Sequence, residues 1–199
     1  GGWDYEADYF AFNLMGDLYQ KTDDKLNDDN RYVWGNGGNQ YVDEQNIAAW
    51  QNYIGSKRSF SDINQLVYFS KLDELIAIRN GDNGNVGSVP ESMQTFFTGS
   101  YKELLDYLIY AKQCQAFADV RYYDWYSEVD YNAEEIEPLI EEGSRLWAQA
   151  ISKELKIRDG YQLIRLAHYS NKLSLANTFF NKYVSQFNQD HIIYQYAYE

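Results

Sequence analysis

Apolar residues recur at helical spacing through the second half of the chain. From Ile136 to Ile151 they stand three, four, seven, ten, eleven, fourteen and fifteen positions after the first, which marks one face of a helix. Pro138 is expected to kink this helix near its start. The earlier segment Tyr101–Asp119 is apolar on two faces, which indicates a helix packed between neighbours. The same criteria predict further helices at 155–170, 173–187 and 191–199.

Shorter helical segments precede these in the first half. Ile47–Ile54 fits a short amphipathic helix that stops at Gly55. Ser59 and Ser70 each stand three residues before an aspartate, and a hydroxyl followed by a carboxylate at this distance is an Asp variant of the capping box. These two caps predict helices over 60–69 and 71–79.

Turn-forming residues divide the chain into two parts. Residues 80–90 (NGDNGNVGSVP) form the most evident loop and the best candidate for a boundary. We therefore predict an irregular and helical N-terminal subdomain over 1–85 and helical repeats over 86–199, with one continuous domain as the alternative. Residues 1–42 show neither a strand period nor a helix period, so we expect aromatic-anchored loops there.

Successive helices with short turns are typical of an α-solenoid, and one segment resembles a tetratricopeptide (TPR) repeat. Within Leu163–Val184, Leu173 stands at the usual Tyr position, Ala176 where two helices approach closely, and Phe180 at the aromatic position. Ile164 departs from the small residue of that family, and the closing Pro is missing. The resemblance implies an all-α fold of antiparallel helix pairs in a TPR-like right-handed α-solenoid. A generic helical hairpin is the alternative.

A broader resemblance covers most of the chain. The segments WQNYIG, YLIYAKQCQAF, YYDWY and KIRDGYQLIRLAHYSN, in this order, resemble large uncharacterised envelope proteins of Bacteroidetes, which are similar to lipoproteins with helical repeats. The resemblance implies a place in the bacterial cell envelope, in the periplasm or as an outer-membrane lipoprotein. It also implies that Gly1 follows a removed or lipidated Cys and that the repeats continue past Glu199. It implies no activity, because that group has no assigned chemistry.

The charge of the chain narrows the classes of partner. Seventeen basic residues stand against 30 acidic ones, a net charge of −13, and no segment is a basic island. Nucleic-acid binding needs clusters of Lys and Arg to neutralise phosphates, so we expect no nucleic-acid partner. No run of 18 apolar residues exists, so we expect no transmembrane span. Cys114, the single cysteine, is expected to act as a small buried hydrophobe.

Sequence motifs for catalysis or metal binding are missing. His168 and His191 are the two histidines, and the chain has no HExxH, CxxC, GxSxG, Walker or GxGxxG pattern. We expect His168 at the surface of the helix pair. We also expect no catalytic residue, no metal and no cofactor. A hydrolase with a carboxylate pair is a minor alternative, and calcium binding by the loops at 23–30 and 80–85 is another.

Aromatic residues offer the best candidates for a binding surface. They make up 18% of the chain, and one cluster lies between two predicted helices: Tyr122, Tyr123, Trp125 and Tyr126. Exposed rings would anchor a protein partner or stack on sugars, whereas buried rings would only hold helices together. The leading expectation is a helical-repeat scaffold that binds a protein or peptide partner, and a glycan-binding surface protein is the alternative. The oligomeric state stays open.

Overall fold

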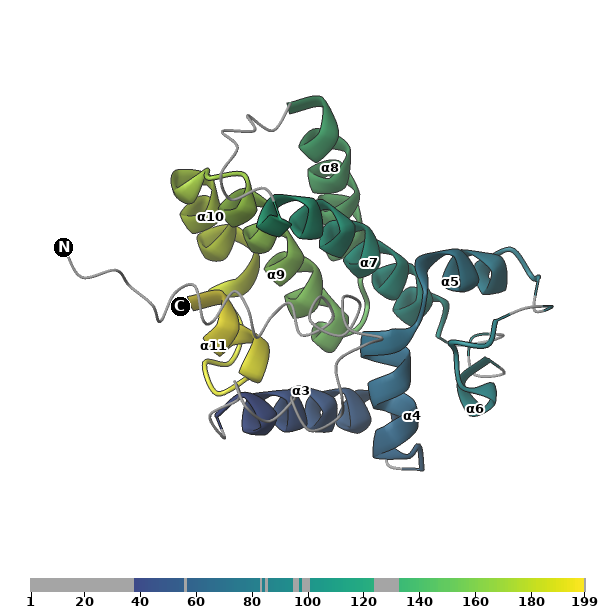
Figure 1. The fold of residues 1–199 in the computed structure, drawn as a ribbon. Coiled ribbons are helices and arrows are strands. Elements are labelled where there is room, and N and C mark those ends of the chain that lie inside the picture. Colours follow the sequence, from purple (N-terminus) through teal and green to yellow (C-terminus); the bar gives the residue numbers. More distant parts are fainter. Residues whose placement is uncertain are drawn as a thin grey trace.

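The computed structural model describes residues 38–55, 57–82, 84, 86–94, 97, 101–123 and 133–198, and for 38–43, 116–123 and 133–135 it describes the backbone alone. Every regular element in these ranges is helical, which confirms the predicted all-α class (Figure 1). The elements are α3 (Gly38–Ile54), α4 (Phe60–Asn64), the π-helical turn η2 (Gln65–Phe69), α5 (Leu72–Arg79), α6 (Glu91–Gln94), α7 (Lys102–Tyr123), α8 (Ala133–Gln149), α9 (Lys153–Tyr169), α10 (Leu173–Phe179), the π-helical turn η4 (Phe180–Val184) and α11 (Ile192–Tyr198). The TPR-like order of these helices stays a prediction.

The ends of α3 and α5 lie close to the predicted positions, whereas the start of α3 does not. Gly55 and Gly81 follow α3 and α5 with φ angles of 110° and 82°, a left-handed conformation that strains any residue with a Cβ atom. α3 begins at Gly38, well before the predicted start near Ile47. Its first turns carry no apolar stripe, so they give no periodic signal in the sequence. Pro138 lies inside α8.

One of the two predicted helix caps is confirmed and the other is wrong. The Ser59 hydroxyl oxygen accepts a hydrogen bond from the Asp62 backbone N–H at 3.0 Å, as a cap of α4 should. The residue that caps α5 is Lys71, and it makes no side-chain cap hydrogen bond. Ser70 instead donates its hydroxyl hydrogen to the Leu66 carbonyl, one turn earlier. The Ser70 hydroxyl therefore bonds to a carbonyl at the end of η2 and does not cap α5.

Among the described residues, three hydrophobic clusters form the core, and α9 contributes to each of them. The first cluster joins α3, α4, α5, α6 and the first half of α7, and includes Leu155 from α9. The second joins α9 to α10, η4 and α11, and the third joins α7, α8 and Leu166 of α9. As Figure 1 shows, α9 lies between α7 and α8 on one side and α10 and α11 on the other. Ile157–Ala167 is consequently buried around the whole helix. The first cluster contains residues on both sides of residue 85.

Two glycines let neighbouring helices approach α9 closely. A Cβ atom on Gly143 of α8 would overlap the Tyr110 hydroxyl of α7 and come within 2.9 Å of the Leu163 side chain of α9. A Cβ atom on Gly160 of α9 would lie 3.0 Å from the Cβ of Tyr183 in η4. These glycines therefore set the distances of α8 and η4 from the central helix.

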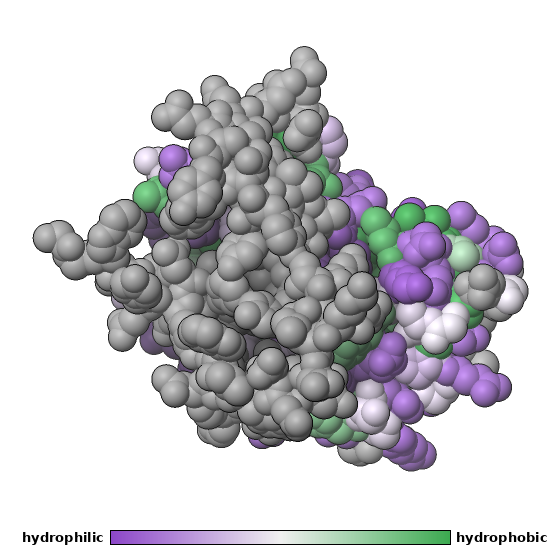
Figure 2. All heavy atoms as spheres, viewed as in Figure 1, coloured by the Kyte–Doolittle hydropathy of each residue, from purple (hydrophilic) through white to green (hydrophobic). Residues whose placement is uncertain are grey.

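The exposed apolar side chains of the described surface are scattered. Figure 2 shows hydrophobic residues interspersed with hydrophilic ones over α5, at the right of the molecule. Isolated apolar residues on a surface are ordinary. The largest of them are Phe60, Ile76, Ile151, Leu173 and Tyr198. Across the described helices, none has the length and apolar character needed to cross a membrane.

Candidate functional site

The central helix α9 places a row of polar residues in the interior. Arg158, Tyr161, Gln162 and Arg165 follow one another at spacings of three, one and three residues, so they share one face of the helix. Arg158 is 1% exposed and Arg165 is 9% exposed. Charged residues are seldom this deeply buried unless they are paired, so the pairing of each guanidinium is the first question.

These four residues line a cavity between α9, α3, η2, α7 and α11. Aromatic rings from three helices form much of its wall: Trp50 from α3, Tyr107 from α7 and Tyr196 from α11. The cavity has a volume of about 80 Å³, counted as the space that the centre of a water molecule can occupy. At about 10–15 Å³ for each water, this volume holds roughly five to eight water molecules. It is large enough for one small chemical group and too small for a folded segment.

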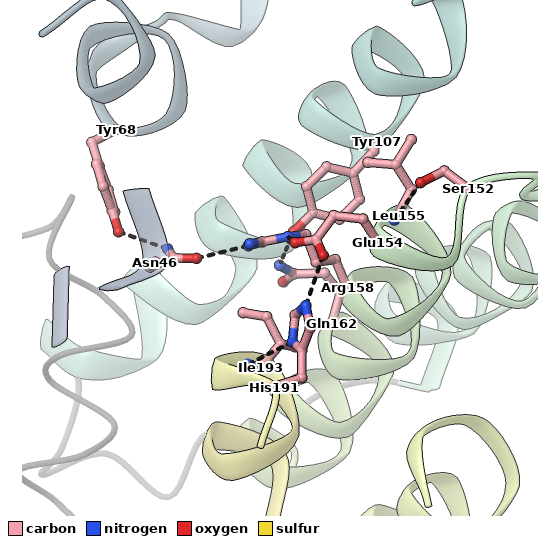
Figure 3. A network of polar contacts seen from close by, with 10 residues as sticks. All are labelled: Asn46, Tyr68, Tyr107, Ser152, Glu154, Leu155, Arg158, Gln162, His191 and Ile193. Atoms are coloured by element: carbon pink, nitrogen blue, oxygen red, sulfur yellow. Dashed lines mark hydrogen bonds and ion pairs between the residues drawn. The ribbon is translucent and has the colours of Figure 1, made fainter. Parts of the chain in front are cut away.

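The Arg158 guanidinium lies over the Trp50 ring, 3.8 Å from its centroid. Two of its three nitrogens donate hydrogen bonds to other side chains (Figure 3). Its Nε donates to Glu154 Oε1 at 2.7 Å, and its Nη1 donates to Asn46 Oδ1 at 2.8 Å. The Asn46 amide nitrogen in turn donates to the Tyr68 hydroxyl at 2.7 Å. Arg158 therefore joins α9 to α3 and η2, and it fixes the wall of the cavity on that side.

Glu154 neutralises Arg158. Its second carboxylate oxygen lies 2.7 Å from His191 Nε2, just before α11. The His191 Nδ1 accepts a hydrogen bond from the Ile193 backbone N–H at 3.1 Å, so a proton on Nε2 donates to Glu154 (Figure 3). Burial alone would raise the pKa of Glu154, but the His191 hydrogen bond and the Arg158 charge outweigh it and lower that pKa. Glu154 is therefore ionised at neutral pH.

Arg165 has a different environment. Its Nη1 donates to Gln162 Oε1 at 3.0 Å, and the Gln162 amide nitrogen donates to the Tyr107 hydroxyl at 3.1 Å. Desolvation raises the pKa of Tyr107 to about 12, so this hydroxyl stays protonated at neutral pH. The Tyr161 and Tyr169 rings lie about 6 Å from the Arg165 guanidinium. Among the described residues, no carboxylate forms an ion pair with Arg165.

The cavity contains an excess of hydrogen-bond donors. Five buried donor atoms on its lining residues have no partner within the described part of the chain: Arg158 Nη2, Arg165 Nε, Arg165 Nη2, Gln115 Nε2 and the Tyr161 hydroxyl. A buried donor without any partner, from the protein or from water, costs about 1–3 kcal/mol, so a group that enters the cavity is stabilised by hydrogen bonds to such donors. These donors therefore mark the cavity as the candidate binding site.

The aromatic site predicted from the sequence stays a prediction. Tyr122 and Tyr123 belong to the last turn of α7, but their side chains lie outside the described residues, as do Trp125 and Tyr126 entirely. Arg158 and the other cavity residues belong to no motif that predicts a binding site from the sequence. The available signal was the pattern RxxYQxxR inside a predicted helix, which puts two cations on one face.

Cys114 and His168 are not among the residues that line the cavity. Cys114 is buried in α7, and burial raises the pKa of its thiol to about 12, so the thiol is protonated at neutral pH. This agrees with its predicted role as a buried hydrophobe. His168 is exposed near the end of α9, as predicted. Within the described ranges, no group of three or more His, Cys, Asp or Glu side chains is placed to hold a metal ion.

Comparison with models of protein families, with curated proteins and with solved structures gives no match to this chain.

Proposed function

We propose that this chain is a helical-repeat scaffold that binds a protein or peptide partner, and that one small group of the partner enters the α9 cavity. The observation that carries the proposal is the set of unpaired donors on one face of α9, enclosed by α3, α7 and α11. A binding pocket combines apolar and aromatic walls with a few converging polar groups, and this cavity has both. Its volume suits a side chain or a chain end, so the rest of the partner would lie outside.

The protonation states of the side chains at the cavity favour ligand binding over catalysis. Glu154 is already held by Arg158 and His191, so its carboxylate is occupied. Burial raises the pKa values of Tyr107 and Tyr161 well above neutrality, so both hydroxyls keep their protons. Such groups hold a ligand in place, whereas general acid–base catalysis calls for a group that titrates near the working pH. Asp159 has a pKa raised to about 8, but it is not among the residues that line the cavity.

The hairpin of α9 and α10 supports a TPR-like arrangement. Asn171, at the turn where the TPR family usually has Gly, adopts a left-handed φ of 56°. Ala176 of α10 is partly buried against the second cluster, and a Cβ atom on Gly160 of α9 would lie 3.0 Å from the Tyr183 Cβ in η4. Close packing of paired helices through small residues is what a solenoid requires. The proposed place in a bacterial envelope, as a periplasmic or lipidated protein, rests on the sequence resemblance.

A glycan partner receives less support from this cavity. Sugars bind aromatic rings by lying flat on an open face. The Arg158 guanidinium already lies over the Trp50 ring at 3.8 Å. The Trp50 indole therefore offers less stacking surface than an open ring.

The proposal can be tested by selecting peptides from a displayed random library on the immobilised domain. Ala111 lines the cavity, so Ala111→Phe should fill it, whereas Ala148→Phe adds the same ring at an exposed position of α8. We expect the selected peptides to bind wild type and Ala148→Phe alike, and Ala111→Phe at least about tenfold more weakly. Circular dichroism checks that both variants keep their helices. The proposal fails if no peptide is selected, or if all three proteins bind the selected peptides equally.

A further inference from the structure

We propose that the group bound in the α9 cavity is a carboxylate, held side-on by Arg165. The inference shares its cavity with the proposed function, but small carboxylates can test it without any peptide. It rests on three observations, which are the donor edge that Arg165 leaves unused, the charge inside the cavity and the additional donors around it.

The unused edge of Arg165 has the shape of a carboxylate receptor. Its Nη1 is engaged by Gln162, while Nε and Nη2 are buried and without a partner in the described part of the chain. The hydrogens on Nε and on the adjacent Nη2 point in the same direction in the guanidinium plane. Two parallel N–H groups at this spacing bind both oxygens of a carboxylate at once. Gln162 is itself held by the Tyr107 hydroxyl, so the edge is oriented before a ligand arrives.

The charged side chains of the cavity favour an anionic ligand. Glu154 lies 2.7 Å from Arg158 and cancels its charge, whereas Arg165 has no carboxylate partner among the described residues. Lys112, at a partly exposed part of the wall, donates to the Tyr68 carbonyl oxygen at 3.0 Å and adds positive potential. A buried guanidinium without a counter-ion is costly, so an anionic ligand stabilises the site as it binds. A cation would be repelled, and a neutral amide would leave the charge uncompensated.

Three further unpaired donors belong to residues that line the same cavity. Arg158 Nη2, Gln115 Nε2 and the Tyr161 hydroxyl are buried and unpaired in the described ranges. Burial raises the pKa of Tyr161 well above its ordinary value, so that hydroxyl keeps the hydrogen it would donate. A carboxylate offers about four lone-pair sites on its two oxygens. We favour a carboxylate over a phosphate because one planar fork and one uncompensated buried charge match a planar monoanion.

Titration of wild-type protein with propionate tests the inference directly. The reporter is the Nε–Hε signal of Arg165 in a ¹³C,¹⁵N-labelled sample, assigned through bonds from the Arg165 backbone and checked by its loss in Arg165→Met. At constant ionic strength we expect saturable shifts with propionate and at least about tenfold weaker binding of the isosteric propionamide, because ionised acceptors bond more strongly than neutral ones. Equal binding of propionamide, tighter binding of inorganic phosphate, or no saturable shift would each overturn the carboxylate assignment.

Matched variants distinguish binding by the unused edge of Arg165, a fork of two parallel N–H groups, from attraction by any positive charge. Arg165→Met removes the fork and Arg165→Lys keeps only a point charge, and we expect both to weaken propionate binding at least about tenfold. Arg145→Met makes the same charge change at an exposed ion pair with Glu142, and we expect an effect below about twofold. An equal loss in Arg145→Met would contradict a local fork. If Arg165→Met does not fold, the three wild-type titrations still decide between the outcomes.

The source of the carboxylate is settled with selected peptides. Each peptide is compared with its C-terminally amidated form and with forms in which Asp or Glu is replaced by Asn or Gln. Loss on amidation identifies a chain end, and loss on side-chain replacement identifies an acidic residue. Peptides that bind while propionate does not would refute the carboxylate and leave the proposed function standing. Propionate binding without any peptide binding would support the carboxylate site and refute the proposed function.

Discussion

Replacing Gly143 with alanine removes the space that lets α8 lie against α7 and α9. An alanine Cβ atom would overlap the Tyr110 hydroxyl oxygen, lie 2.6 Å from Tyr110 Cζ and lie 2.9 Å from Leu163 Cδ2. Tyr110 is 1% exposed and Leu163 is fully buried, so neither ring nor methyl group has free space to enter. Tyr110 also donates its hydroxyl hydrogen to the Leu139 carbonyl of α8 at 3.0 Å. Displacing the ring therefore breaks a buried hydrogen bond between α7 and α8.

The size of the effect follows from three opposing contributions. Alanine is better than glycine inside a helix by about 1 kcal/mol, which stabilises the variant. Overpacking a filled interior costs about 1–3 kcal/mol, and losing the Tyr110 hydrogen bond costs about 1 kcal/mol. We therefore expect Gly143→Ala to lower the free energy of unfolding by about 1–3 kcal/mol.

Urea unfolding followed by far-ultraviolet circular dichroism measures this change. Gly87→Ala is the matched control, because a Cβ atom on Gly87 meets nothing within 4 Å. We expect the control to lie within about 0.5 kcal/mol of wild type. The proposed close approach of α8 is wrong if Gly143→Ala is as stable as the control, or more stable.

Two further predictions concern α9. Asp159 is 2% exposed, and burial, followed by the charges of Glu103 and Glu142, raises its pKa to about 8 from 3.8. Because folding favours the protonated form, the contribution of Asp159 to the free energy of unfolding is fully present below about pH 4. This contribution is lost as the pH rises through about 8. Asp159→Asn should therefore stabilise the fold more at about pH 8.5 than at about pH 5 in urea titrations, and an equal effect at both pH values would contradict the shift. Ser152 caps α9 by accepting a hydrogen bond from the Leu155 N–H, so Ser152→Ala should lower the unfolding free energy by about 1 kcal/mol, measured the same way. A change below about 0.3 kcal/mol would mean that this cap contributes little.

Most of the longer helices could be predicted from the sequence because they carry their own periodic signal. Apolar residues at helical spacing placed α7, α8 and α9, and glycines placed the ends of α3 and α5. Local signals failed where a tertiary contact decides the outcome. Ser70 has the spacing of a cap, but its hydroxyl bonds to the Leu66 carbonyl at the end of η2.

The cavity could not be predicted in this way. Arg158, Gln162 and Arg165 occupy one face of α9, and a polar face on an amphipathic helix normally indicates solvent exposure. α3 and α11 cover this face, although they lie more than a hundred residues apart in the chain. Periodicity along α9 contains no information about helices so distant in sequence. The predicted aromatic site at Tyr122 and its neighbours falls on side chains outside the described residues.

The most direct measurement maps a selected peptide onto the protein by two-dimensional ¹H–¹⁵N NMR. If the α9 cavity is the binding site, the largest shifts will fall on the side chains of Arg158, Gln162 and Arg165 and on the adjacent backbone of α3 and α11. Signals from α10, which does not line the cavity, will stay unchanged. If the shifts cluster on α10 or elsewhere while the Arg165 signal does not move, the cavity is not the binding site.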